Sequence, residues 1–143
     1  IVDLNQKIDW GKEYDFVIDC GTAEHCFNIG QVFENIFHAV QPSGGIVIHV
    51  NPLNLMNHGF WNINPTAYKD FFDANDFILI EAIGMYGPKN DRKFFHYSED
   101  QIHKRFVLNK QIGIINLIVA KKISKERHPI VWPTQFKYNK MIK

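Results

Sequence analysis

The sequence predicts an α/β domain built on a mainly parallel sheet that is flanked by helices. Two observations predict this class. Apolar runs and helical patterns alternate along the chain, in the order strand, helix, strand, long loop, helix, strand, helix, strand, which is typical of layered α/β domains. Residues 14–50 also contain two buried strands joined by one amphipathic helix, the pattern of a right-handed parallel βαβ unit.

The first half of this unit is predicted by an apolar run and a helical stripe. Residues 16–18 are apolar and are bounded by Asp15 and Asp19, as expected of a strand that is buried on both faces. Asn28 is the expected N-cap of the helix, with Gln31 three residues later. The apolar stripe of that helix has the spacing i, i+3, i+4, i+7, i+8 and i+11, and consists of Ile29, Val32, Phe33, Ile36, Phe37 and Val40.

The rest of the chain supplies the second strand of the unit and the later elements. Pro42 cannot continue the helix, and Gly44-Gly45 permit a tight turn before the β-branched run 46–50. A tail of another strand is expected at residues 1–4. The later elements are a loop at 51–64, a helix from Asn64-Pro65, a strand at 77–85, a helix from Ser98 that includes Ile102, Phe106 and Val107, and a strand at 113–123. We assign residues 1–123 to a partial domain and residues 124–143 to a C-terminal tail that packs on it.

Composition limits the classes of partner. Sixteen basic residues face fifteen acidic ones, which gives no electrostatic argument for nucleic acid. No apolar stretch approaches the ~20 residues that span a bilayer, and no signal peptide is visible, so we expect no membrane partner. Cys20 and Cys26 are too few for a disulfide framework and favour a reducing, cytoplasmic location. Because the chain begins with Ile1 rather than Met, we expect it to be a fragment that continues N-terminally.

The polar segments of the sequence converge on one edge of the predicted sheet. In open α/β sheets, ligands bind beyond the carboxyl ends of the strands. Asp3, residues 19–25 and residues 51–61 all follow predicted strands and fall at that edge. The loop at 51–64 is long for a compact domain, and its aromatic side chains favour a functional loop over a disordered one.

Three segments in this order resemble a known family: YDFVIDCGTAEHCFN, PSGGIVIHVNP and NHGFWNINP. They resemble the C-terminal half of class I S-adenosylmethionine-dependent methyltransferases, and within them a bacterial group with Glu-His after the fourth strand and His-Gly-Phe after the fifth. The resemblance covers about residues 3–77. It implies a Rossmann-like fold, S-adenosylmethionine as cofactor, and transfer of a methyl group to an oxygen or nitrogen nucleophile of a small molecule or sugar.

The chain departs from that family at the cofactor. The family's glycine-rich loop and its ribose-binding acid occur nowhere in the 143 residues. The alternative is therefore a degenerate methyltransferase-like module that serves binding or assembly without catalysis. A parallel sheet without its central strands would leave an open apolar edge, which we expect another segment, or another chain in a homo-oligomer, to cover.

The resemblance implies cofactor-binding positions on two segments. Asp3 and Leu4 match the positions near the adenine, and Asp19, Cys20 and Gly21 match the carboxyl end of the fourth strand, beside the methionine part of the cofactor. The substrate-binding positions that it implies are Glu24, Asn51 and Asn57. Phe60 and Trp61 are further substrate-binding candidates, because their rings can stack on a sugar or base.

His58 and His25 are the expected catalytic residues, because an imidazole can remove a hydroxyl proton near neutral pH as methyl transfer proceeds. Each has a structural alternative: His25 can bond the backbone at the start of a helix, and His58 can hold its loop against Trp61. Glu24 can likewise favour the positive end of a helix, and Phe60 and Trp61 can pack in the core. His49, inside a strand, is expected to be a core residue.

We expect no metal site among the cysteines and histidines. Cys20, His25, Cys26 and His58 could be written as a ligand set. The spacing Cys-x4-His-Cys matches no common zinc pattern, and the two cysteines fall at a strand end and a helix start.

Overall fold

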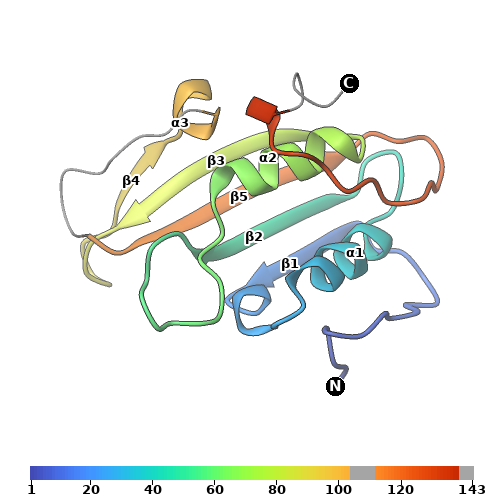
Figure 1. Cartoon of the computed structure of the whole chain (residues 1–143), viewed down its shortest axis with the longest axis horizontal. Coiled ribbons are helices and arrows are strands. Elements are labelled where there is room, and N and C mark those ends of the chain that lie inside the picture. Colours follow the sequence, from blue (N-terminus) through green and yellow to red (C-terminus); the bar gives the residue numbers. More distant parts are fainter. Residues whose placement is uncertain (104–111, 139–143) are drawn as a thin grey trace.

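The computed structural model describes residues 1–103 and 112–138. Its described residues form a sheet of five strands in the order β1-β2-β5-β3-β4 (Figure 1). The strands are β1 (Phe16–Cys20), β2 (Ile46–Pro52), β3 (Phe77–Tyr86), β4 (Lys93–His96) and β5 (Ile114–Lys122). The helices are α1 (Ile29–Ala39), α2 (Pro65–Ala74) and α3 (Glu99–His103), with single 3-10 turns η1 (Ala23–His25) and η2 (Phe136–Tyr138).

The predicted mainly parallel, Rossmann-like sheet with flanking helices is wrong for these residues. Among the five strands of the described residues, only β1 and β2 pair in parallel, so the β1–α1–β2 unit is confirmed. β5 lies between β2 and β3 and is antiparallel to both, and β4 is antiparallel to β3. The order of strands and helices in a sequence does not determine the direction in which a late strand enters a sheet. Because the described sheet is not Rossmann-like, the fold gives no support to the methyltransferase resemblance.

Helix α1 forms as its sequence predicts. The Asn28 side chain accepts a hydrogen bond from the Gln31 backbone N–H at 3.3 Å, which satisfies one of the free donors at the helix start. Its apolar stripe packs into the core, where Val32 and Phe37 are almost fully buried. The stripe therefore fixes which face of α1 lies on the sheet.

Three other predictions meet different outcomes. Helix α2 begins at Pro65 as expected, although the Asn64 side chain makes no capping hydrogen bond. Residues 1–4 form no strand, so the expected strand tail is wrong, and β4 was not predicted. The helix from Ser98 corresponds to α3, whereas Phe106 and Val107 lie outside the described residues.

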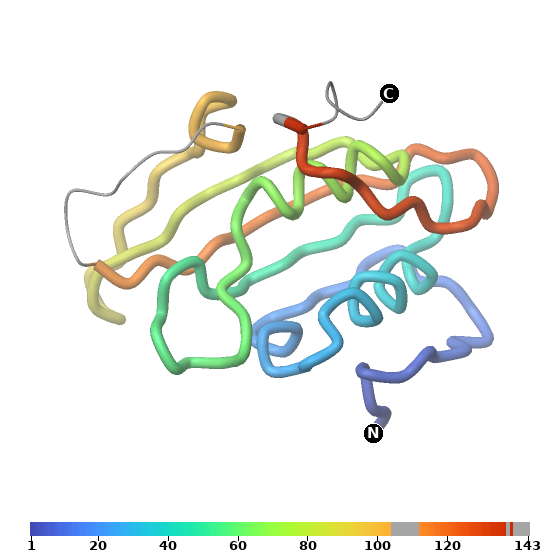
Figure 2. Tube along the Cα trace, in the orientation of Figure 1, coloured from blue at the N-terminus to red at the C-terminus, as the bar shows by residue number. Residues whose placement is uncertain are grey.

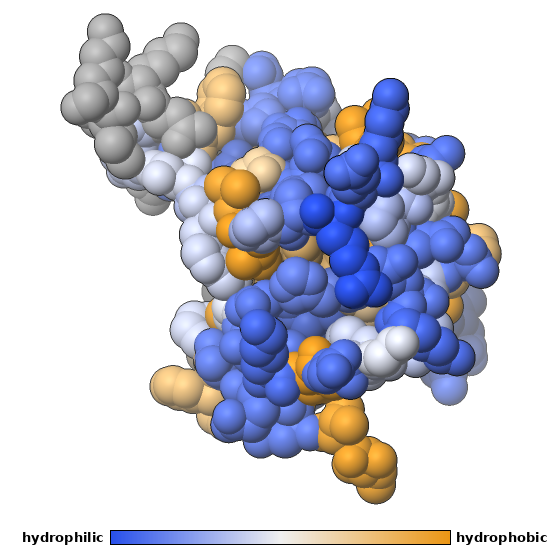
Figure 3. Space-filling view, turned by 90° about the vertical axis from the view of Figure 1, so that its right-hand side faces the viewer, coloured by the Kyte–Doolittle hydropathy of each residue, from blue (hydrophilic) through white to orange (hydrophobic). Residues whose placement is uncertain are grey.

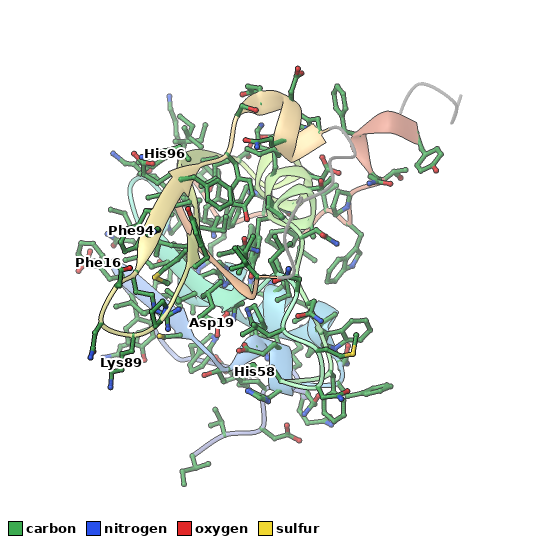
Figure 4. All side chains as sticks on the ribbon, turned by 90° about the vertical axis from the view of Figure 1, so that its left-hand side faces the viewer. Phe16, Asp19, His58, Lys89, Phe94 and His96 are labelled. Carbon is green, nitrogen blue, oxygen red and sulfur yellow. The ribbon has the colours of Figure 1, made fainter. Side chains whose placement is uncertain are left out.

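Helices α1 and α2 cover the same face of the sheet, because rings from both contact His49 of β2. The other face carries exposed apolar side chains, among them Phe16, Ile18 and Ile78. Phe16 and Phe94 lie on that uncovered side in Figure 4. The end that holds the amino termini of β1 and β2 is mostly hydrophilic (Figure 3).

A buried lysine joins the sheet to the C-terminal end of α1. The Lys122 ammonium donates hydrogen bonds to the backbone oxygens of Phe37 and Val40, and lies 3.9 Å from the Phe37 ring centroid. Burial lowers the pKa of Lys122 to about 8. Cations near a helix C-terminus stabilise its unpaired carbonyls.

The segment after β5 runs back along α2 (Figure 2). Val131 exchanges two backbone–side chain hydrogen bonds with Asn75, and the Trp132 ring lies 6.4 Å from that of Phe71. In the described part of the chain, no helix is long and apolar enough to cross a membrane.

Candidate functional site

The candidate site lies at the carboxyl ends of β1 and β2, the end of the molecule seen in Figure 4. Gly21 ends β1 with a positive φ of 71°, and its N–H bonds the Val50 oxygen of β2. This turn leads directly into η1, which carries Glu24 and His25. His58 approaches from the loop between β2 and α2.

Glu24 is a buried carboxylate with one oxygen satisfied and one free. The Glu24 side chain is 1% exposed, and its Oε2 accepts a hydrogen bond from Asn51 Nδ2 at 2.8 Å. Asn51 Oδ1 in turn accepts from the Tyr68 hydroxyl at 2.7 Å. Burial and the charges of Asp19 and Glu24 raise the pKa of Tyr68 well above its ordinary value, so the hydroxyl remains a donor. Glu24 Oε1 has no hydrogen-bond partner among the described residues.

Two histidines face this free oxygen. His58 Nε2 lies 3.5 Å and His25 Nε2 lies 3.9 Å from Glu24 Oε1, and the two rings are 5.2 Å apart. Their side chains are 46% and 49% exposed. The Glu24–His25–His58 cluster therefore joins a buried carboxylate to two imidazoles that solvent can reach.

The loop that carries His58 is fixed against η1. The backbone N–H groups of Phe60 and Trp61 both donate to the Glu24 backbone oxygen, at 2.8 and 3.2 Å. The Trp61 indole N–H donates to the Cys26 oxygen. At Gly59 a Cβ atom would lie only 2.8 Å from the Glu24 oxygen. Only glycine permits this close approach of the two segments.

A second buried pair, Asp19 and His49, lies next to the cluster; both carboxylate oxygens of Asp19 have partners, whereas His49 Nε2 has none among the described residues. Asp19 Oδ2 lies 2.9 Å from His49 Nδ1, and Oδ1 accepts the Ala23 N–H at 3.0 Å. Burial raises the pKa of Asp19, but the hydrogen bond and charge of His49, together with the Ala23 N–H, outweigh it, so this pKa lies below its ordinary value. His49 also stacks on Phe33. Asp19 thus secures the start of η1.

A pocket of about 870 Å³ lies between α1, α2 and the C-terminal tail, and its lining includes none of the three cluster residues. Aromatic rings and side-chain amides line much of it, including Trp61, Phe71, Trp132, Asn62 and Gln101. Trp61 connects the two features, because it lines the pocket and bonds the backbone next to His25.

The structure brings together only some of the residues that the sequence nominated. Glu24, His25, His58, Asn51 and Trp61 lie at one end of the sheet, as the contacts above describe. The roles assigned to them remain predictions.

Other nominated residues take no part in the contacts described above. Asp3 is exposed and accepts hydrogen bonds from Asn5, and the Leu4 oxygen accepts one from Asn35 of α1. Cys20 is exposed at the end of β1. Asn57 is exposed, with a φ of 59°.

Two aromatic residues at the site were not nominated. The sequence places Tyr68 on the apolar face of its helix, and nothing local indicates that its hydroxyl meets Asn51. A signal did exist, because Asn51 alternates with the inward-facing Val47 and His49 and a buried amide needs partners. Phe27 contacts the exposed Phe60 ring at 5.5 Å, a contact that no pattern in the sequence predicts.

Comparisons with protein-family models, with curated proteins and with solved structures find no match for this chain. The inferences about function therefore rest on the geometry of the site and on the sequence.

Proposed function

We propose that this chain provides the acceptor side of an S-adenosylmethionine-dependent methyl-transfer site, which acts on an oxygen or nitrogen nucleophile of a sugar or other small molecule. The observation that carries the proposal is the half-exposed His58 imidazole, 3.5 Å from the buried Glu24 carboxylate, beyond the carboxyl ends of the parallel pair β1 and β2. The sequence resemblance supplies the class of reaction.

The pocket lined by Trp61 offers both apolar and polar groups to an acceptor, and its lining also includes Asp70 and His103. The rings of Trp61, Phe71 and Trp132 offer apolar faces, and the amides of Asn62 and Gln101 offer both donors and acceptors. Pockets of this kind bury the apolar face of a ligand and orient it through a few polar groups. A sugar presents both an apolar ring face and hydroxyl groups.

The cluster supplies orientation at the reacting atom. An imidazole nitrogen of His58 or His25 accepts a hydrogen bond from the acceptor's hydroxyl or amine, which fixes the direction of its lone pair. Because Glu24 is held by Asn51 and by the loop backbone, the two imidazoles face a fixed charge. S-adenosylmethionine supplies the electrophilic methyl group when bound.

The residues assigned to the cofactor fit it unequally. Cys20 is exposed at the end of β1, which suits the methionine end of the cofactor, whereas the Gly21 N–H already donates to the Val50 oxygen. The Asp3 carboxylate is exposed and accessible. Asp19 does not fit, since both of its oxygens are engaged by Ala23 and His49. We assign Asp19 to support of η1 instead.

The test measures cofactor binding and methyl transfer separately. S-adenosylhomocysteine is titrated calorimetrically into this chain and into the full-length product of its gene, and labelled methyl transfer to a panel of sugars is then followed. His58→Gln should lower kcat by roughly 100-fold or more, the usual contribution of a positioned acid–base group. His96→Gln is the matched control, because His96 pairs with Glu81 in an exposed carboxylate–imidazole contact on β3 and β4.

Two results would overturn the proposal: no heat from S-adenosylhomocysteine with either protein, or equal turnover by the His58 and His96 variants. Sugar binding without methyl transfer would support the non-catalytic module instead.

We also propose a reducing, cytoplasmic location, supported by Cys20 and Cys26, which are both free thiols.

A further inference from the structure

We infer that Glu24, His25 and His58 form a binding site for a divalent transition-metal ion of the zinc type. The inference deepens the proposed function and rests on it only for the catalytic consequence; metal binding itself requires no methyl transfer. One ligand atom from each residue, a carboxylate oxygen of Glu24 and a ring nitrogen of each histidine, lies within 4.8 Å of the other two.

The distances within the cluster suit a shared ion better than direct hydrogen bonds. Zinc binds nitrogen at 2.0–2.1 Å and carboxylate oxygen at 2.0–2.2 Å, so tetrahedral geometry puts neighbouring donor atoms about 3.3 Å apart. The separations of 3.5 and 3.9 Å from Glu24 Oε1 to the two imidazoles are close to that spacing. Small rotations of the two half-exposed imidazole rings would shorten these separations to the spacing expected in a zinc site.

The free oxygen of Glu24 is the second and independent observation. This atom is buried and has no hydrogen-bond partner in the described ranges, 1–103 and 112–138. A buried carboxylate oxygen without a partner is unfavourable, and each such atom calls for a reason. A cation between Oε1 and the two imidazoles satisfies it directly.

Residues around the cluster orient the three candidate ligands, as residues behind the ligands do in known metal sites. Asn51 binds the second oxygen of Glu24, and Tyr68 binds Asn51, which orients the carboxylate so that Oε1 faces the histidines. The Phe60 and Trp61 N–H groups tie the His58 loop to the Glu24 backbone. Ligands from separate segments are therefore positioned before any ion arrives.

The ligand chemistry selects the class of ion. Two imidazoles with one carboxylate suit zinc and related transition metals, whereas calcium and magnesium prefer oxygen ligands. Because both histidines are half exposed, the fourth position faces the solvent. An acceptor oxygen bound there has a lowered pKa, so the ion would replace direct contact between the imidazoles and the acceptor. The sequence pattern pointed away from metal because it paired the histidines with Cys20 and Cys26 rather than with Glu24.

The test titrates zinc chloride alone into protein freed of metal by chelation, with calorimetry for affinity and cobalt(II) absorption for coordination. We expect one ion per chain. His58→Ala and Glu24→Gln should each weaken binding by at least roughly 100-fold, more than the loss of an outer partner causes. His96→Ala and Cys26→Ser are the controls and should bind as the unaltered chain does. Since His58 is half exposed, its variant should fold, which circular dichroism checks.

Absence of saturable zinc binding, or binding that survives His58→Ala and Glu24→Gln, would overturn the inference. Loss of binding in Cys26→Ser or His96→Ala would overturn it as well, by moving the site elsewhere. Methyl transfer that persists after chelation would refute the role of the metal and leave the proposed function standing. Zinc binding without any methyl transfer would support the metal site and refute the proposed function.

Discussion

The neighbouring strands β2 and β5 each carry a buried asparagine that accepts a hydrogen bond from a tyrosine hydroxyl. The two asparagines differ in the group to which they donate. Asn51 of β2 is paired in register with Asn116 of β5, and each accepts a tyrosine hydroxyl at 2.7 Å. Tyr68 of α2 donates to Asn51, and Tyr97, which follows β4, donates to Asn116. All four residues are almost fully buried.

The two arrangements differ in what the amide nitrogen contacts. Asn116 Nδ2 donates to the Ile63 backbone oxygen at 2.7 Å, which closes the β5 arrangement on a neutral peptide group. Asn51 Nδ2 donates to the Glu24 carboxylate, whose other oxygen faces two accessible histidines. A buried Tyr–Asn pair is thus structural on β5 and supports a candidate site on β2. The terminal group, rather than the pair, distinguishes the two.

The largest expected effect comes from replacing each asparagine with leucine. Asn51→Leu should lower the free energy of unfolding by about 3–5 kcal/mol, because it leaves a buried carboxylate without its partner. Asn116→Leu should lower it by about 2 kcal/mol, since only neutral groups lose partners. Urea denaturation measures both. Equal losses, or a larger loss for Asn116→Leu, would mean that Glu24 carries no buried charge that Asn51 must satisfy.

The asparagine variants must be compared at one pH, because burial of Lys122 makes the free energy of unfolding depend on pH. The folded pKa of about 8 lies below the ordinary 10.5, so burial of the charged amine opposes folding below pH 8. Between these values the unfolded chain binds more protons than the folded one, and stability rises with pH. The whole rise is on the order of 3 kcal/mol, at 1.36 kcal/mol for each pKa unit.

Lys122→Met should lack this rise, which denaturation at about pH 7 and about pH 10 would measure as the difference between the two proteins. Tyrosine ionisation in the unfolded state affects both proteins equally and cancels. Parallel pH profiles would contradict the lowered pKa.

The smallest effect separates the two tyrosines. Tyr68→Phe and Tyr97→Phe should each lower the free energy of unfolding by about 1 kcal/mol, the net value of one hydrogen bond. Only Tyr68→Phe should also weaken zinc binding, by several-fold, because Tyr68 orients Glu24 through Asn51. Calorimetric titration of both variants makes the measurement. Equal zinc affinities in the two would separate Tyr68 from the cluster.

The sequence predicts local elements of this fold better than it predicts the sheet. The stripe and the Asn28 cap of α1 are local patterns, and both appear as expected. The direction of β5 depends on which neighbours it meets, and its apolar alternation is the same for either direction. β4 is four residues long with two phenylalanines, too short for a clear period.

The sequence likewise predicts part of the candidate site and misses the rest. Glu24, His25 and His58 follow two strands that were predicted to be parallel, so the sequence was sufficient to bring them to one edge. Their support by Tyr68 depends on how α2 packs across β2, which no spacing in the sequence records. The free oxygen of Glu24 is equally a tertiary property.

Gly59 has a mechanical consequence for the cluster. Because there is no room for a side chain between the His58 loop and the Glu24 backbone, any larger residue at position 59 must push the loop after β2 away from the turn after β1. Such a shift would carry the His58 imidazole away from the Glu24 carboxylate.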